Sequence, residues 1–175
     1  MVTADTSIVY IGLGSNLEHP PQQIRNAMLA LDDIPHTRVV ADSGLFLSKP
    51  MLAPTAPVTQ PDYYNAVAKI ETQLGPYELL DQLQQIEDTQ QRTRLEHWGP
   101  RTIDLDILMF DDVQMNNERL TLPHAGVHQR EFVLYPLRNI DSSLKIPGRG
   151  MLNDLIKNCP GNGLRYLGTI EGYEE

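Results

Sequence analysis

The nine residues Thr102-Ile-Asp-Leu-Asp-Ile-Leu-Met-Phe110 carry the strongest structural signal in this chain. Their second half is so apolar that we expect a strand in the centre of a sheet. Side chains alternate along a strand, so Asp104 and Asp106 point to one face, while the apolar residues between and beside them point to the other. The prediction is a central strand that presents two carboxylates to a common hollow.

Two neighbouring carboxylates in such a strand need a partner, because they repel each other and lose hydration. Mg²⁺ is the natural candidate, since it prefers oxygen ligands and completes its octahedron with water and phosphate oxygens. The alternative is a pair of solvent-facing aspartates on an edge strand. Aspartate is a poor strand former, which favours the metal site. Asp104 and Asp106 are therefore the predicted metal ligands.

The segment just before this strand is rich in arginine and reads Arg92-Thr-Arg-Leu-Glu-His-Trp-Gly-Pro-Arg101. Five of the fourteen basic residues lie between positions 92 and 130, and all are arginine: Arg92, Arg94, Arg101, Arg119 and Arg130. Guanidinium groups match phosphate oxygens, so the cluster predicts a small anionic ligand such as a metal-bound polyphosphate. The net charge of −9 argues against nucleic acid or an anionic membrane as the main partner. The alternative is a set of solvated arginines.

The known glycine-rich phosphate loops do not account for this ligand. The sequence contains no G-x-x-x-x-G-K-S/T motif. The stretch from Gly12 to Asn16 follows a strand, but Leu17 stands where a dinucleotide-binding fingerprint needs its third glycine. We interpret Gly12 and Gly14 as a tight turn with close backbone approach, and Ser15 or Asn16 as the cap of the next element. Side chains and metal must then neutralise the phosphate charge.

Other side chains leave alternatives open. Glu87, on a predicted helix, is either a solvated residue or an orienter of a ribose or an arginine. Trp98 lies beside a Gly-Pro turn, where it either stacks on a flat ring as part of a lid or packs in the interior. His124 and His128, spaced i, i+4, could form a zinc site with Cys159, but no third ligand lies near them in sequence and the segment reads as a loop.

Hydrophobic periodicity predicts the order of elements. Strands are expected over Ser7–Ile11, Thr37–Leu47, Tyr64–Thr72 and Thr102–Phe110, and helices over Pro20–Leu31 and Pro76–Gln91. The order β-α-β-β-α-β predicts an α+β fold with helices on one face of an antiparallel sheet. After Asp111 we expect short β pieces and a helix at Met151–Lys157 that decorate this core, while residues 158–175 suggest no role.

The bulk properties suit a single domain spanning residues 1–175, a length without room for a fused partner. Cys159 is the only cysteine, so a reducing compartment is expected. The N-terminus lacks a signal pattern, and no apolar run approaches the roughly 18 residues of a membrane span. We expect a monofunctional cytoplasmic protein, with a monomer as the default state.

Several longer stretches resemble the 6-hydroxymethyl-7,8-dihydropterin pyrophosphokinase family of the folate pathway. They follow the family's order over nearly the whole chain and comprise residues 10–17 (Tyr-Ile-Gly-Leu-Gly-Ser-Asn-Leu), 61–66 (Pro-Asp-Tyr-Tyr-Asn-Ala), 92–94 (Arg-Thr-Arg), 98–107 (Trp-Gly-Pro-Arg-Thr-Ile-Asp-Leu-Asp-Ile), 120–124 (Leu-Thr-Leu-Pro-His) and 130–137 (Arg-Glu-Phe-Val-Leu-Tyr-Pro-Leu). The 98–107 block is highly specific. The resemblance implies a ferredoxin-like sandwich with extra C-terminal elements, and transfer of pyrophosphate from ATP to the pterin hydroxymethyl group with release of AMP.

The resemblance also implies roles for individual residues, carried over by position. Asp104 and Asp106 would bind two Mg²⁺ ions that bridge the triphosphate, with Arg92 and Arg101 as further catalytic residues. The residues lining the ATP side would be Gln84, Glu87, Arg92, Arg94, Trp98, Arg101, Ile107, Arg119, Thr121, His124 and Arg130. Those lining the pterin side would be Ser48, Pro50, Met51, Tyr63, Asn65, Trp98 and Phe132. Among these, Asn65 would hydrogen-bond the ring and Phe132 would stack on it.

The chain departs from the family pattern in three places. Where the family shows Tyr-x-Thr-x-Pro followed by Trp or Leu and then Gly, this chain reads Phe46-Leu-Ser-Lys-Pro-Met-Leu52, which puts the local backbone contacts to the pterin in doubt. Ala125 stands where Tyr is frequent and His97 where Arg is frequent. Two other functions stay open: a catalytically silent nucleotide-binding module, and a phosphohydrolase with Asp104 and Asp106 as its metal ligands.

Overall fold

The computed structural model describes residues 5–49, 61–90, 102–161 and 163–174. The helices are α1 (Pro20–Asp32), α2 (Pro76–Gln90), α3 (Glu131–Ile140) and α4 (Leu152–Lys157). The strands are β1 (Ser7–Ser15), β2 (Thr37–Asp42), β3 (Leu45–Ser48), β4 (Tyr63–Thr72), β5 (Asp104–Phe110), β6 (Met115–Asn116), β7 (Thr121–Leu122), β8 (Lys145–Ile146), β9 (Gly150–Met151) and β10 (Arg165–Gly168). The elements up to β5 follow the predicted order.

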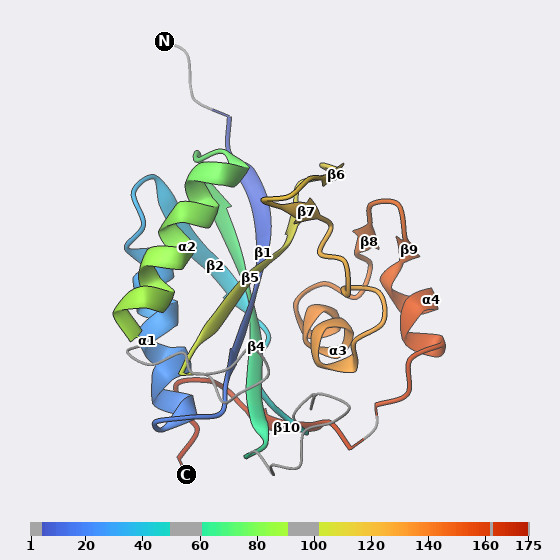
Figure 1. Cartoon of the computed structure of the whole chain (residues 1–175). Coiled ribbons are helices and arrows are strands. Elements are labelled where there is room, and N and C mark those ends of the chain that lie inside the picture. The colour runs from blue at the N-terminus through green and yellow to red at the C-terminus, as the bar shows by residue number, and fades with distance from the viewer. Residues whose placement is uncertain (1–4, 50–60, 91–101, 162, 175) are drawn as a thin grey trace.

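The main sheet is antiparallel and runs in the order β10-β3-β4-β1-β5, with β2 also paired to β4. β1 therefore lies between β4 and β5, and each of the crossovers through α1 and α2 skips one strand. Because such crossovers are right-handed, both helices lie on the same face of the sheet, as Figure 1 shows. Leu79 and Leu83 of α2 and Ile24 of α1 are fully buried against that face. The ferredoxin-like α+β prediction is confirmed.

The predicted strand Thr37–Leu47 is two strands, because the backbone breaks at Gly44. That residue has φ +77, and a Cβ there would lie 2.8 Å from the carbonyl oxygen of Gly168. Only glycine tolerates both the angle and the close approach. β2 and β3 then pair with different lengths of β4.

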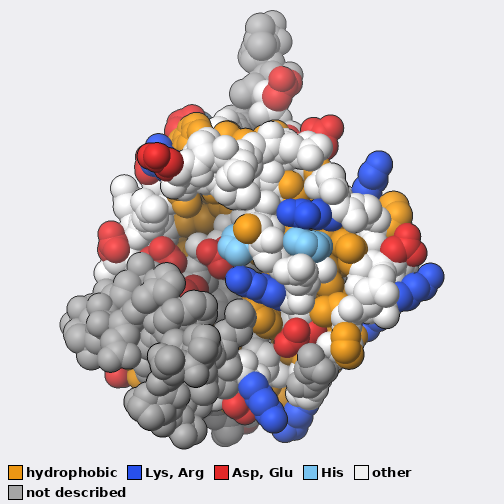
Figure 2. All heavy atoms as spheres, turned by 45° about the vertical axis from the view of Figure 1, so that its right-hand side comes forward, with side chains coloured by type: hydrophobic (Ala, Val, Ile, Leu, Met, Phe, Trp, Pro, Cys, Tyr) orange, Lys and Arg blue, Asp and Glu red, His pale blue; other side chains and the backbone are white. Residues whose placement is uncertain are grey.

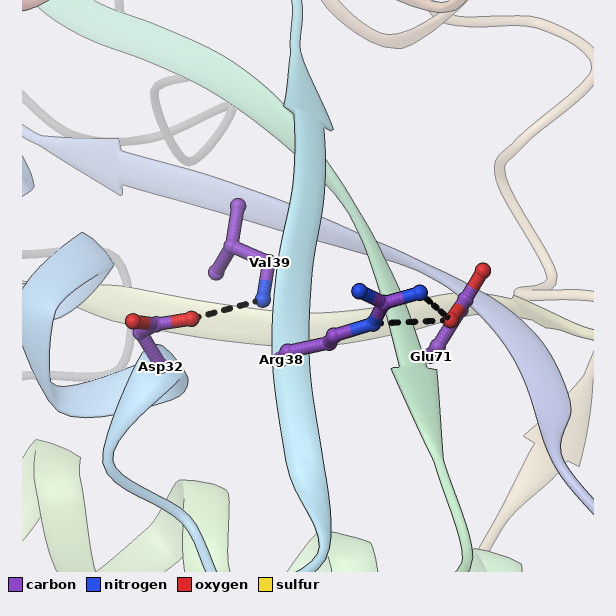
Figure 3. Close-up of polar contacts among 4 residues, drawn as sticks. All are labelled: Asp32, Arg38, Val39 and Glu71. Atoms are coloured by element: carbon purple, nitrogen blue, oxygen red, sulfur yellow. Dashed lines mark hydrogen bonds and ion pairs between the residues drawn. The ribbon is translucent and has the colours of Figure 1, made fainter.

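Polar side chains connect α1 to β2, and β2 to β4. The Asp32 carboxylate accepts the Val39 N–H at 2.9 Å, and Arg38 forms an ion pair with Glu71, its cross-strand neighbour (Figure 3). Opposed charges on paired strands support the register. The end of α1 is thus held to the strand that comes after it, and that strand to its neighbour in the sheet.

The opposite face of the sheet is covered as well, which the sequence did not predict. α3 packs there with α4 (Figure 1). Val67, Leu108 and Leu134 belong to a second apolar cluster on this face. The local pattern does not favour a helix here, because Pro136 lies inside α3 and removes a backbone donor. Burial of the surrounding apolar residues stabilises the helix despite that loss. Helices therefore lie on both faces, and the expectation of one covered face was wrong.

β5 is the last strand of the sheet, so its predicted central position was also wrong. The strand is apolar because both of its faces are covered: Ile107 packs with the α1 and α2 layer, and Leu108 with the α3 layer. Its register with β1 shifts between Tyr10 and Ile11, so Leu108 and Met109 share one face. Burial on two sides and position within a sheet are separate properties.

The segment after α4, for which the sequence suggested no role, extends the sheet. β10 pairs with β3, and the Arg25 guanidinium on α1 donates to the backbone oxygens of Ile170, at 3.0 Å, and Tyr173. The C-terminal residues are thereby held beside α1 (Figure 1). Among the described residues, none of the helices combines the length and apolar character that a membrane span requires.

Candidate active site

A pocket of about 320 Å³ opens on the α3 face of the sheet. Its floor is β1, and its walls come from β5, from the ends of β3 and β4, and from the start of α3. Figure 2 shows this side of the molecule, with histidine and basic side chains gathered next to a recess that contains carboxylates. Of the residues implied by the family resemblance, the pocket is lined by Ser48, Tyr63, Asn65, Asp104, Asp106, His124, Arg130 and Phe132.

The floor of the pocket is open because β1 carries two glycines there. Gly12 pairs with Asp106 on one side and Val67 on the other, while Gly14 pairs with Asp104 and Asn65. Any larger residue would place its side chain between the two walls. The interpretation of these glycines as a turn was wrong, since both lie within β1.

The predicted helix cap was wrong as well. α1 begins after His19, whose side chain makes no capping hydrogen bond. Asn16 instead donates from Nδ2 to the carbonyl oxygen of Pro61 at 3.0 Å. This bond ties the end of β1 to the residues that precede β4, next to the pocket wall.

Asp104 and Asp106 both line the pocket, and Leu105 between them is buried in the opposite layer. Asp104 is half-buried and Asp106 is exposed to the pocket. In the described part of the chain, no group of three or more His, Cys, Asp or Glu side chains is arranged to hold a metal ion. Two carboxylates that leave most positions to phosphate oxygens and water suit Mg²⁺, which keeps several such ligands. The donor set therefore fits the predicted ion.

The wall opposite the carboxylates is built around Asn65 on β4. Its Nδ2 donates to Ser48 Oγ at 2.7 Å and to the Tyr63 carbonyl oxygen at 3.3 Å, so the side chain, which is 6% exposed, has a fixed orientation. Its Oδ1 lies 3.6 Å from the position that a Cβ on Gly14 would occupy. This acceptor thus lies above the floor, within reach of N–H groups on a bound ring.

The third wall combines a cation with an aromatic ring at the start of α3. Arg130 is the N-cap residue of α3, and its guanidinium carbon lies 5.8 Å from the centre of the Phe132 ring. His124 is fixed by its backbone N–H, which donates to the Leu108 carbonyl oxygen at 2.9 Å, and its Nδ1 accepts the Gly126 N–H at 3.2 Å. Arginine and a helix N-terminus both favour anions, so this wall suits phosphate.

The structure does not bring every carried-over residue to this pocket. Ile107 is buried in the α1 and α2 layer, and Gln84 is exposed on α2. Arg119 forms an ion pair with Asp81 of α2 and lies over the Tyr77 ring.

Two more of these residues have partners elsewhere. Thr121 donates to Asn116 Oδ1 at 3.0 Å, and Glu87 contacts the backbone of β5. Six carried-over residues lie outside the described ranges: Pro50, Met51, Arg92, Arg94, Trp98 and Arg101.

Other lining residues were not predicted to contact a ligand. These are Gly12, Leu13, Gly14, Lys49, Ala66, Val67, Leu108 and Val133. The glycines could have been found from their i, i+2 spacing, which is the same as that of Asp104 and Asp106. If the first strand is extended to Ser15, this spacing places both glycines on one face of the strand, as it does the two aspartates. Lys49 adds a cation on the wall near Asn65, directly after the buried Ser48.

The residues of the proposed zinc alternative have other surroundings. The Cys159 thiol donates to the Gln129 carbonyl oxygen at 3.6 Å, and burial raises its pKa. Burial, followed by the positive charge of Arg149, lowers the pKa of His128, which favours a neutral ring there. Neither residue lines the pocket, whereas His124 does. His124 therefore lines the carboxylate pocket and does not form a site with Cys159.

Comparison with known proteins identifies a family. The model of the family described as 7,8-dihydro-6-hydroxymethylpterin-pyrophosphokinase matches residues 10–142. A 2-amino-4-hydroxy-6-hydroxymethyldihydropteridine pyrophosphokinase of Haemophilus influenzae is 48% identical over 157 residues, which is 90% of this chain and 92% of the relative. The protein of the same name from Pseudomonas aeruginosa is 44% identical over 159 residues, covering 91% of this chain and 96% of the relative.

Solved structures support the fold alone. Wild-type HPPK-DHPS of Plasmodium falciparum with pteroate superposes with a TM-score of 0.68 at 14% sequence identity. The match covers 88% of this chain and 44% of that chain, so this protein spans less than half the length of its structural neighbour.

Proposed function

Because the chain belongs to the 7,8-dihydro-6-hydroxymethylpterin-pyrophosphokinase family, we infer that it transfers pyrophosphate from ATP to the hydroxymethyl group of 6-hydroxymethyl-7,8-dihydropterin in folate biosynthesis, releasing AMP. The observation that carries this function is the pocket itself. It combines a carboxylate pair and a wall suited to phosphate with a fixed amide and an aromatic ring. A phosphate donor and a flat heterocycle can therefore bind side by side.

The pterin is proposed to bind over Gly14, between the wall of Asn65 and the ring of Phe132. Asn65 Oδ1 would accept ring N–H groups, since Ser48 and the Tyr63 backbone already hold the amide nitrogen. Stacking on Phe132 would orient the ring plane. Ser48, Tyr63, Pro50, Met51 and Trp98 complete the proposed pterin side.

The triphosphate is proposed to bind between the aspartates and the start of α3. Two bound Mg²⁺ ions would supply neutralisation of the phosphate charge, with Asp104 and Asp106 as their protein ligands. Arg130 and His124 would donate to phosphate oxygens from the facing wall. The remaining proposed residues of the ATP side are Gln84, Arg92, Arg94, Trp98, Arg101, Ile107, Arg119 and Thr121, of which Arg92 and Arg101 are also proposed as catalytic.

The reaction asks the protein mainly to position its substrates. The oxygen of the hydroxymethyl group attacks the β-phosphorus of ATP in line, the bond from that phosphorus to the bridging α–β oxygen breaks, and AMP leaves while the hydroxyl proton passes to solvent. We assign no general base, since a loose transition state requires little nucleophile activation. Pocket walls that fix both partners supply the entropic part of the rate enhancement.

We further propose that a single domain over residues 1–175 performs this reaction as a cytoplasmic monomer, with no nucleic acid or membrane partner. The acidic net charge supports the exclusion of polyanions. The shared apolar layers on both faces of one sheet support a single folding unit. Light scattering during size-exclusion chromatography checks the monomer, and a mass near 19.7 kDa is the expected result.

One assay tests the function against both alternatives. Purified protein is incubated with ATP and Mg²⁺, with or without hydroxymethyl-dihydropterin, and the nucleotide products are separated by chromatography. AMP that forms only with the pterin supports the transferase. Phosphate release from ATP alone supports a hydrolase, and ATP binding without turnover supports a silent nucleotide-binding module. Chelation with EDTA is expected to abolish AMP formation, and added Mg²⁺ to restore it.

The Asn65→Ala variant tests the pterin side. Loss of one hydrogen bond of about 1.4 kcal/mol raises the KM for the pterin about tenfold, while the KM for ATP stays the same. Steady-state kinetics with each substrate varied in turn check this, with thermal unfolding as the stability control. An unchanged pterin KM in Asn65→Ala would remove Asn65 from the site.

A further inference from the structure

Glu87 lies on α2, outside the pocket lining, yet it contacts the peptide between the two pocket aspartates. Its Oε2 accepts the backbone N–H of Leu105 at 2.9 Å. We propose that Glu87 is a positioning residue that holds β5 so that Asp104 and Asp106 present their carboxylates correctly to the metal-bound phosphates. The proposal rests on the proposed function of this pocket and assigns Glu87 a role other than that of a nucleotide ligand.

β5 needs such a contact because it is the last strand of the sheet. On its inner edge Asp104 pairs with Gly14 and Asp106 with Gly12, so β1 fixes the strand on that side. Backbone groups of the intervening Leu105 point to the outer edge, where the described part of the chain provides no paired strand. An outward N–H without a partner would be bonded only to water, and the strand could tilt. Glu87 provides the acceptor that a further strand would have supplied.

A second contact holds the same edge. The carbonyl oxygen of Leu108 accepts the backbone N–H of His124 at 2.9 Å. The two contacts, at Leu105 and Leu108, lie on either side of Asp106 along the strand. Together they restrict rotation of this part of β5 about its own axis. That rotation is the motion that would turn the carboxylates away from the pocket.

α2 is a rigid support for this contact. Leu79 and Leu83, two turns and one turn before Glu87 on the same helix, are fully buried, and they pack in the cluster that also contains Leu105 and Ile107. Glu87 itself is half-buried at the junction of α2 and β5. A hydrogen bond that a carboxylate accepts in such surroundings is stronger than one to a neutral acceptor.

The consequence for function comes from the precision that a metal site demands. Ligating carboxylates must be held within about 0.5 Å of their productive geometry. Residues that orient metal ligands through a second contact typically change metal affinity or activity by about 10- to 100-fold when removed. Because both aspartates flank the peptide that Glu87 holds, one substitution on α2 should weaken the binding of metal by both of them.

The test compares Glu87→Ala, which lacks the acceptor, with Glu87→Gln, whose amide oxygen can still accept the Leu105 N–H. Asp88→Ala, an exposed neighbour on the same helix, is the matched control. The first readout is amide hydrogen exchange at Leu105, measured by NMR without metal or nucleotide. The second is Mn²⁺ affinity in the presence of a non-hydrolysable ATP analogue, measured by electron paramagnetic resonance.

Glu87→Ala is expected to accelerate exchange at Leu105 at least tenfold and to weaken Mn²⁺ binding by about 10- to 100-fold, while Glu87→Gln and Asp88→Ala stay near wild type. In kinetics, kcat should fall in Glu87→Ala and the KM for the pterin should not change. Unchanged exchange or unchanged Mn²⁺ affinity in Glu87→Ala would overturn the proposal. The proposal would also be overturned if Glu87→Ala weakened nucleotide binding without metal as much as it weakened Mn²⁺ binding. That outcome would identify Glu87 as a direct nucleotide ligand.

Different experimental results would contradict the positioning role of Glu87 and the proposed function of the pocket. If wild-type protein forms no pterin-dependent AMP, the proposed function is wrong, whatever Glu87 does. If wild-type protein forms AMP but Leu105 exchanges at the same rate with and without the Glu87 carboxylate, only the positioning role is wrong. Thermal unfolding of each variant identifies a general loss of structure, and Glu87→Gln then decides the role because it preserves the packing of the side chain.

Discussion

Asp104→Ala and Asp106→Ala are each expected to lower kcat/KM by about 10³-fold or more. Both side chains line the pocket next to the two glycines of β1, and they are the two pocket carboxylates on β5. Without either one, a metal-bound triphosphate loses a protein ligand and the charge that develops on the transferred group is less well neutralised. Initial rates of AMP formation at saturating ATP and pterin, over a range of Mg²⁺ concentrations, provide the measurement.

Asp112→Ala is the control for this prediction. Asp112 is an exposed carboxylate just beyond the end of β5 and does not line the pocket, so its removal changes the net charge equally without touching the site. Asp106→Asn, which keeps the shape and removes the charge, should fall with the alanine variants. Turnover retained by both alanine variants at saturating Mg²⁺ would show that the carboxylate pair is not the metal site.

Gly14→Ala is expected to raise the KM for the pterin or lower kcat so that kcat/KM falls about 10²-fold, while the protein stays folded. The new Cβ would lie 3.6 Å from Asn65 Oδ1 and 3.7 Å from the Tyr63 ring, which are ordinary contacts, so the sheet itself accepts the methyl group. The methyl group would, however, occupy the floor on which the heterocycle is proposed to lie. A ring displaced by about 1 Å no longer aligns its hydroxymethyl oxygen with the β-phosphorus.

The matched control adds the same methyl group elsewhere. Gly75→Ala, before α2, would place its Cβ 3.4 Å from Glu78 Oε1, and neither residue lines the pocket. Isothermal titration with the pterin and separate titration with an ATP analogue distinguish the two sides of the pocket. Wild-type pterin affinity and turnover in Gly14→Ala would mean that the ring does not lie over this part of β1.

Much of the fold can be predicted from local patterns. The i, i+3, i+4, i+7 spacing from Pro20 to Leu31 predicts α1, and the apolar face of Leu79 and Leu83 predicts α2, because a helix buries residues at that period whatever it packs against. The bounds of both helices agree with the prediction to within one residue. The antiparallel sheet follows from the specific order β-α-β-β-α-β, which is that of the split βαβ arrangement.

The errors have a common physical origin. Local preference ends the first strand at Gly12 because a glycine has low strand propensity, yet β1 continues to Ser15 through its pairing with β4 and β5. No local pattern indicates α3 because Pro136 weakens it, and the helix forms because Leu134 and Leu137 are fully buried against the sheet. In each case a contact distant in sequence outweighed a local preference.

In the active site, too, local sequence predicts some features and only the tertiary structure decides the others. Local alternation along a strand is enough to place Asp104 and Asp106 on one face, since the period of two is a property of the extended backbone. That Gly12 and Gly14 lie directly beside them, with Asn65 beyond, depends on the register of three strands, which no local pattern specifies. One short segment was enough to predict the chemistry of the carboxylates. The pocket itself exists only because strands distant in sequence pair side by side and α3 covers the face of the sheet opposite α1 and α2.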